Sequence, residues 1–126
     1  MFSAKSILCH IDTYNSTMTY EEVTITSQED IFNLIGDGKV GSVKQINIDK
    51  YHKVFYDYTD EAFSNGVSAR VKTYAYHDKE VRKWIDFESE EFVLGDKLLL
   101  VLCDDKVPID MTEDAKQFII SCINCQ

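Results

Sequence analysis

The feature that most constrains the fold of this 126-residue chain is the segment "KLLLVLCD" at residues 97–104. Its apolar residues are consecutive, whereas a half-buried strand alternates apolar and polar residues. A short continuous apolar run between polar neighbours is typical of a strand that is buried on both faces. The sequence therefore predicts a sheet in which this segment is the central strand.

The other strand-like segments are rich in β-branched and aromatic residues, and they predict three further pairings. Residues 4–11 and 18–25 form the first predicted pair, residues 43–50 and 52–59 the second, and residues 68–88 a hairpin. In this hairpin the first arm alternates from Ala69 to Tyr76, and the second places Val81, Ile85 and Phe87 on one face.

Two segments carry the signals of helices. In "SQEDIFNLIG", Ser27 and Asp30 have the spacing of a capping box, and Gly36 follows the last apolar position as a terminating glycine does. Near the other end, Asp110 or Thr112 is expected to cap a helix with apolar positions at helical spacing, namely Ala115, Phe118, Ile119, Cys122 and Ile123.

These elements together predict an α+β fold in one domain over residues 1–126. We expect a single, mainly antiparallel sheet of about six or seven strands with two helices, one early and short and one C-terminal.

Residues Gly36 to Gly41 spell G-x-G-x-x-G, the glycine spacing that lets a backbone approach a pyrophosphate. A nucleotide site of this kind needs the order strand, glycine loop, helix, because the phosphate binds at a helix N-terminus. Here the glycines follow a predicted helix, so the nearest helix end presents carbonyl oxygens and a partial negative charge. The motif is therefore interpreted as a helix stop and a turn, and no cofactor is expected.

The cysteines could in principle form a redox or metal site. Cys122 and Cys125 form a C-x-x-C pair, but at the C-terminal end of a predicted helix, where the dipole disfavours a thiolate. Together with Cys9, Cys103 and His10 they lack a second metal-type pair at a recognisable spacing. The preferred interpretation is that Cys9, Cys103 and Cys122 are small buried apolar residues and that Cys125 is a frayed terminal one, so no metal is expected.

No catalytic residue is assigned either. The sequence contains no nucleophile elbow and no H-E-x-x-H motif. His52 and His77 fall in predicted turns among charged residues, where histidine is usually solvated. The protein is therefore expected not to be an enzyme.

The charge of the chain is uneven. The formal net charge is −9, and residues 86–126 contain 10 acidic and only 3 basic residues, a net charge of −7. Direct nucleic-acid binding is disfavoured because it relies on Lys and Arg at phosphates. A partner with a basic face would instead be attracted to this surface. The longest apolar run, residues 98–103, is too short to cross a bilayer, and no export signal is recognised, so a cytoplasmic protein without membrane contact is expected.

Aromatic residues among acidic ones form the candidate binding surface, because an anchor with a charged rim is typical of protein interfaces. The candidate partner-binding residues are Asp57, Tyr58, Asp60, Asp86, Phe87, Glu88, Glu90, Glu91, Phe92, Asp104 and Asp105.

The order of these elements resembles that of the small acidic immunity proteins of bacterial contact-dependent inhibition and polymorphic toxin systems. The resemblance rests on the capped segment "SQEDIFNLIGDG", the tyrosine-rich "VKQINIDKYHKVFYDY" and the late "VPIDMTEDAKQFIISC". It implies a cytosolic antidote that binds a cognate toxin domain, often a nuclease, and blocks its basic substrate cleft. Two alternatives remain open: a viral or phage antagonist of a host nucleic-acid enzyme, and a small ligand-binding domain.

Overall fold

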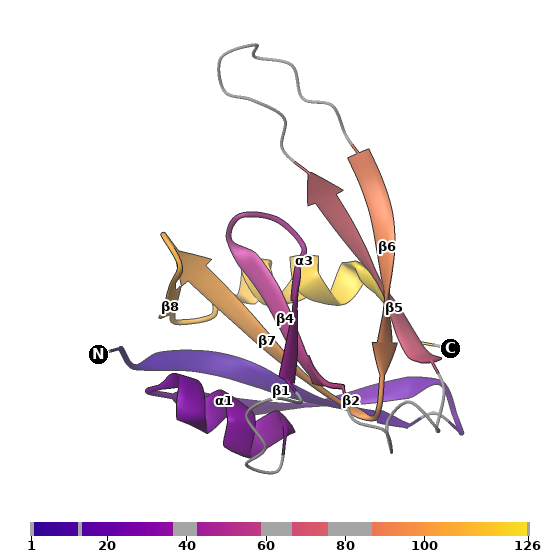
Figure 1. Cartoon of the computed structure of the whole chain (residues 1–126), viewed down its shortest axis with the longest axis horizontal. Helices are drawn as coiled ribbons and strands as arrows, with labels where there is room; N and C mark the ends of the chain where they lie inside the picture. Colours follow the sequence, from indigo (N-terminus) through magenta and orange to yellow (C-terminus); the bar gives the residue numbers. More distant parts are fainter. Residues whose placement is uncertain (1, 13, 37–42, 59–66, 76–86, 126) are drawn as a thin grey trace.

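A computed structural model describes residues 2–12, 14–36, 43–58, 67–75 and 87–125 of the chain (Figure 1). Its larger sheet has six strands, and its smaller sheet has three. The larger sheet contains β1 (Ala4–Asp12), β2 (Thr17–Ile25), β3 (Val43–Asn47), β4 (His52–Asp57), β7 (Lys97–Asp104) and β8 (Val107–Ile109). The smaller sheet contains β5 (Val67–Ala75), β6 (Phe87–Leu94) and β9 (Ile123–Cys125).

The larger sheet is built around β7, as the continuous apolar segment predicts. The strand order is β2-β1-β7-β4-β3 with β8 also paired to β7, and every pairing is antiparallel. Leu98 and Leu100 lie in the apolar cluster on one face of β7, while Leu99 and Val101 lie in the cluster on the other face. All four are fully buried, because both faces of this strand are covered.

Different elements cover the two faces. Helix α1 (Gln28–Ile35) packs on the face that carries Leu99, through Ile31 and Ile35. Helix α3 (Glu113–Ser121) and the smaller sheet pack on the face that carries Leu100, through Ile119 and Val71 among others. In Figure 1 the two helices accordingly lie on opposite sides of the larger sheet.

The α+β class, the antiparallel pairing and the two helices are confirmed, but the strands are divided between two sheets instead of forming one. β9 follows α3 directly, and it pairs with β5 through Val71 and Ile123. The sequence pattern assigned Ile123 to the end of the helix, because an apolar residue at that spacing fits either element. β9 forms an edge of the smaller sheet by pairing with β5, and the helix ends at its C-cap, Cys122.

The predicted hairpin at residues 68–88 has its first arm in β5, but the strand that pairs with β5 is β6, in the register Arg70 to Phe92. Phe87, expected near the end of the second arm, is therefore the first residue of β6. Val81 and Ile85 lie outside the described residues. The predicted pairs β1–β2 and β3–β4 are confirmed.

The structure confirms Ser27 as the cap of the first helix, and of the two expected caps of the second helix it selects Thr112. The Ser27 hydroxyl accepts a hydrogen bond from the Asp30 backbone N–H, while the Asp30 carboxylate accepts from the backbone and side chain of Thr26 instead of Ser27. Thr112 caps α3 by accepting from the Ala115 N–H. Gly36 ends α1 with a φ of −99°, and the other glycines of the G-x-G-x-x-G motif lie outside the described residues.

Candidate functional site

The turn between β3 and β4 holds a histidine and an aspartate in direct contact. The Asp49 carboxylate accepts hydrogen bonds from the backbone N–H groups of Tyr51 and His52, both at 2.8 Å. The same carboxylate lies 2.8 and 2.9 Å from His52 Nδ1. Side-chain oxygens of aspartate often close turns in this way, and here the closure also aims the carboxylate at the imidazole. The expectation that His52 is a solvated turn residue is therefore wrong.

The pair is largely shielded from water. The exposed fraction of the side chain is 7% for Asp49 and 18% for His52. The ring of Phe118, from α3, meets the His52 ring edge to face, with the ring centroids 4.6 Å apart. Packing on one side and the carboxylate on the other therefore fix the orientation of the imidazole.

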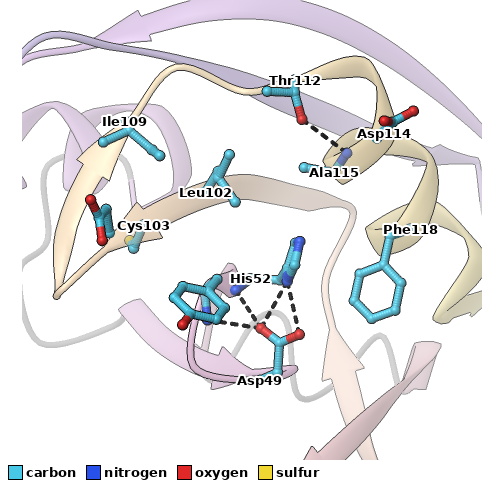
Figure 2. Close-up of a pocket in the computed structure, with 11 residues that line it drawn as sticks. Asp49, His52, Leu102, Cys103, Ile109, Thr112, Asp114, Ala115 and Phe118 are labelled. Carbon is cyan, nitrogen blue, oxygen red and sulfur yellow. Dashed lines mark hydrogen bonds and ion pairs between the residues drawn. The ribbon is translucent and has the colours of Figure 1, made fainter.

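His52 opens onto a groove, which we call the His52 groove. Its volume is about 520 Å³. It is lined by Asp49, Tyr51, His52, Leu102, Cys103, Asp104, Ile109, Thr112, Asp114, Ala115 and Phe118. Figure 2 shows one imidazole nitrogen bonded to Asp49 and the other pointing away from Asp49, toward the start of α3. The lining is mostly apolar, with Leu102, Ile109 and Phe118 between the polar groups.

The hydrogen bonds define what the imidazole can offer to a ligand. A carboxylate only accepts hydrogen bonds, so Nδ1 is the nitrogen that carries the proton toward Asp49. In the neutral ring, Nε2 is then an acceptor. With a neutral imidazole, the groove therefore contains a hydrogen-bond acceptor in a fixed position among apolar side chains.

A tight hairpin places acidic residues beside the groove. β7 and β8 are joined by Asp105 and Lys106, whose φ angles are 47° and 69°, as a two-residue type I′ turn requires. The turn carries Asp104 at the end of β7, where it lines the groove. Another lining carboxylate, Asp114, lies in the first turn of α3 and points away from His52 toward the rim in Figure 2.

The charge of the groove is one-sided. No Lys or Arg is among its lining residues, and within the described residues neither Asp104 nor Asp114 has an ion-pair or side-chain hydrogen-bond partner. Two cations lie close to lining residues: Lys50, whose Nζ is 5.7 Å from the centre of the Tyr51 ring, and Lys53, whose charge acts on Cys103. The groove is therefore suited to a cationic ligand and unsuited to a phosphate.

A second set of candidate residues lies on the smaller sheet, where one basic residue of the chain, Arg70, contacts two of them. Arg70 Nη1 lies 3.8 Å from Glu90 Oε2, and the Arg70 guanidinium lies 5.5 Å from the centre of the Phe92 ring. We call Arg70, Glu90 and Phe92 the β5–β6 cluster. Phe92 remains 54% exposed, so this cluster is a surface feature.

Tyr58 and Glu91 lie where the two sheets meet. Lys44 Nζ lies 5.7 Å from the centre of the Tyr58 ring, and the Tyr58 ring meets that of Tyr56 edge to face at 6.4 Å. Burial raises the pKa of Tyr56, and the charges of Glu91 and then Tyr58 raise it further. Glu91 is thus electrostatically coupled to β4, whereas its neighbour Glu90 bonds on the other face of β6.

The predicted partner-binding residues that the structure describes lie in separate groups. Tyr58 lies against Tyr56, which pairs with Leu98 near the start of β7. Asp104 is the last residue of β7, so at about 3.3 Å per residue it lies about 20 Å from Leu98. Asp57 points to the opposite face of β4 from Tyr56, because side chains alternate along a strand. Asp60 and Asp86 lie outside the described residues, and for Phe87 and Glu88 only the backbone in β6 is described.

The cysteines lie in the interior, as expected for Cys9, Cys103 and Cys122. Cys9 and Cys122 belong to the cluster under α3, whereas Cys103 belongs to the cluster under α1, so they do not converge. Burial raises the pKa of Cys9 to about 12. Cys125 is half-buried in β9 and not at a frayed end. No group of three potential metal ligands is present among the described residues.

The Asp49–His52 pair is the feature of the candidate site that sequence reasoning missed. Its one signal is the spacing in "DKYH", an aspartate at the start of a tight turn with a histidine three residues later. Asp104 had a local signal in its acidic neighbourhood, but the contribution of Phe118 and Asp114 has none, because the groove forms only when α3 and the β7–β8 hairpin meet the β3–β4 turn.

Neither helix of the described chain has the length and apolar character that crossing a bilayer would need. No protein-family model, curated protein or solved structure matches the chain significantly.

Proposed function

We propose that this protein is an immunity protein. It would bind the basic face of a cognate toxin domain and cover that domain's active-site cleft. The observation that carries the proposal is the His52 groove, an acid-rimmed apolar hollow without Lys or Arg among its lining residues, in a chain with a net charge of −9. A hollow of this composition would accept basic side chains of a partner and would repel nucleic acid.

The inhibition would be steric. Carboxylates such as Asp104 would lie where substrate phosphates bind on a nuclease, and the excess negative charge would accelerate the encounter of the two proteins. Apolar contacts made after the encounter would set the dissociation rate. The protein would act by binding alone, so it needs no catalytic group of its own.

The test uses the toxin domain encoded by the adjoining reading frame, expressed with and without this protein. We expect a stable one-to-one complex in size-exclusion chromatography and loss of the toxin's nuclease activity at equimolar amounts. In stopped-flow measurements, the association rate should fall by about tenfold or more between about 50 mM and about 500 mM salt, because screening weakens electrostatic steering. An association rate that does not change with salt would contradict the acidic-surface mechanism, and a toxin that stays active in the complex would contradict the occlusion of its cleft.

A further inference from the structure

We propose that the His52 groove receives an arginine side chain of the basic partner. This inference rests on the proposed function, because it takes the occupant to be part of a protein with a basic face. The groove is a binding site of defined chemistry, with an oriented imidazole at its base, apolar walls and carboxylates on its rim.

The base of the groove supplies the hydrogen-bond acceptor. Asp49 holds the proton of the neutral imidazole on Nδ1, so the Nε2 lone pair of His52 is directed away from Asp49 and toward the start of α3 (Figure 2). A guanidinium group carries five N–H donors and no acceptor, so it complements this nitrogen. A ligand that offers only acceptors, such as a phosphate, would leave Nε2 without a donor and would also face the rim carboxylates.

The walls match the rest of an arginine side chain. Leu102, Ile109 and Phe118 present apolar surface, on which the three methylene groups of arginine can pack while the charged group stays at a polar position. The guanidinium is also more weakly hydrated than an ammonium group, so bringing it into a partly buried groove costs less than burying lysine.

The rim supplies the opposite charge. Asp104 and Asp114 flank the groove on the β7–β8 hairpin and on the first turn of α3. Neither has a charged partner within the described residues, in contrast to Glu90. The two carboxylates therefore attract a cation to the groove without being neutralised by the chain itself.

The chain contains an internal precedent for this chemistry. In the β5–β6 cluster, the guanidinium of Arg70 lies over the Phe92 ring at 5.5 Å and 3.8 Å from Glu90. An aromatic ring and a carboxylate there hold an arginine of the protein itself. The His52 groove offers a ring from Phe118, carboxylates and an additional acceptor, but no arginine of its own among the lining residues.

The first experiment titrates the isolated protein with N-acetyl-arginine methylamide and follows the His52 ring nitrogens by long-range proton–nitrogen NMR. The matched control probe is N-acetyl-citrulline methylamide, which has nearly the same shape but no charge. We expect the arginine probe to shift the Nε2 resonance and the methyl resonances of Leu102 and Ile109, with the citrulline probe binding about tenfold more weakly or not at all. Equal effects of the two probes, or no effect of either, would overturn the inference.

The second experiment separates the groove from the general charge of the protein. The double variant Asp104→Asn with Asp114→Asn removes two carboxylates that line the groove, whereas Asp105→Asn with Glu113→Gln removes two neighbouring carboxylates that do not. Both variants change the net charge equally. We expect the first to weaken binding of the arginine probe and of the toxin domain by several-fold, and the second by less than about twofold. Equal effects on the probe would overturn the inference.

The outcomes also distinguish this inference from the proposed function. If the toxin domain binds but the two double variants weaken it equally, the immunity function stands and the arginine site falls. If the arginine probe binds selectively but the toxin domain does not bind, the groove is a guanidinium site and the proposed immunity function is wrong. The inference that the occupant is an arginine of the toxin domain is then wrong as well.

Discussion

The His52 groove and the β5–β6 cluster contain the same types of side chain and differ in how much of the chain is arranged around them. In the groove, Asp49 has three hydrogen bonds to the turn that contains it, and Phe118 from α3 packs on His52. In the cluster, Glu90 and Phe92 lie on an exposed strand and contact one arginine of the neighbouring strand. Acidic and aromatic residues close in sequence thus indicate a charged surface, but tertiary packing decides whether a recognition site forms.

The largest expected difference between the two regions concerns their acidic residues. Asp49→Ala leaves the N–H groups of Tyr51 and His52 without their acceptor, and it should lower the free energy of unfolding by about 3 kcal/mol. Glu90→Ala removes an exposed ion pair at 3.8 Å and should cost less than about 0.5 kcal/mol. Urea unfolding followed by circular dichroism measures both. If both variants lose a similar free energy of unfolding, the acidic residue of the groove is held no more firmly than that of the β5–β6 cluster.

The aromatic residues of the two regions should also differ in how much they contribute to the free energy of unfolding, with the larger contribution in the groove. Phe118→Ala removes the ring that packs on His52 and should cost about 2 kcal/mol, less than a fully buried phenylalanine because Phe118 is partly exposed. Phe92→Ala should cost less than about 1 kcal/mol, since Phe92 is 54% exposed. Thermal unfolding of both variants, with NMR of the His52 ring, provides the comparison. A His52 ring signal unchanged in Phe118→Ala would show that α3 does not fix the imidazole.

The hairpin beside the groove offers a stabilising change. Lys106 has a φ of 69°, a conformation that costs a non-glycine residue free energy but costs glycine almost none. Lys106→Gly should therefore raise the free energy of unfolding by about 1 kcal/mol. Asp105→Gly serves as the control and should gain less, because aspartate tolerates this region better. A loss of stability in Lys106→Gly would mean that its side chain contributes more than the turn geometry costs.

The smallest expected effect tests the junction of the two sheets. Glu91→Gln should lower the raised pKa of Tyr56, by less than about one pH unit, because burial is the larger cause of the shift. The folded pKa lies above that of the unfolded chain, so Tyr56 favours folding below pH 10 and loses this contribution as the pH rises through its folded pKa. NMR titration of ring-labelled tyrosine measures the change. Glu21→Gln is the control, and an equal shift in that variant would exclude a specific effect of Glu91.

Much of the fold could be predicted because its signals are local. The continuous apolar run at residues 97–104 identified the central strand. Ser27 marked the start of the first helix, and Asp110 or Thr112 marked the start of the second to within two residues. The division into two sheets had no such signal. The register of β5 with β6, and the pairing of the last residues with β5, depend on contacts between separate segments of the chain.

The candidate site was less predictable than the fold. Asp104 was identified as a candidate from its acidic neighbourhood, and the structure places it on the His52 groove. His52 was not, because a histidine among charged residues in a turn has the same local sequence whether it is solvated or held by a carboxylate and a ring. Glu90 and Phe92 were expected to be available to a partner, but Arg70 already contacts both.

The sequence by itself determined the central strand, the helix caps and the acidic balance of the last third, since each depends on residues within one segment or on a sum over residues. Only the tertiary structure decided where the groove lies, because its lining comes from the β3–β4 turn, the β7–β8 hairpin and α3, which are distant in sequence. The physical reason is that a side chain's function depends on its exposure and on its neighbours, and packing sets both.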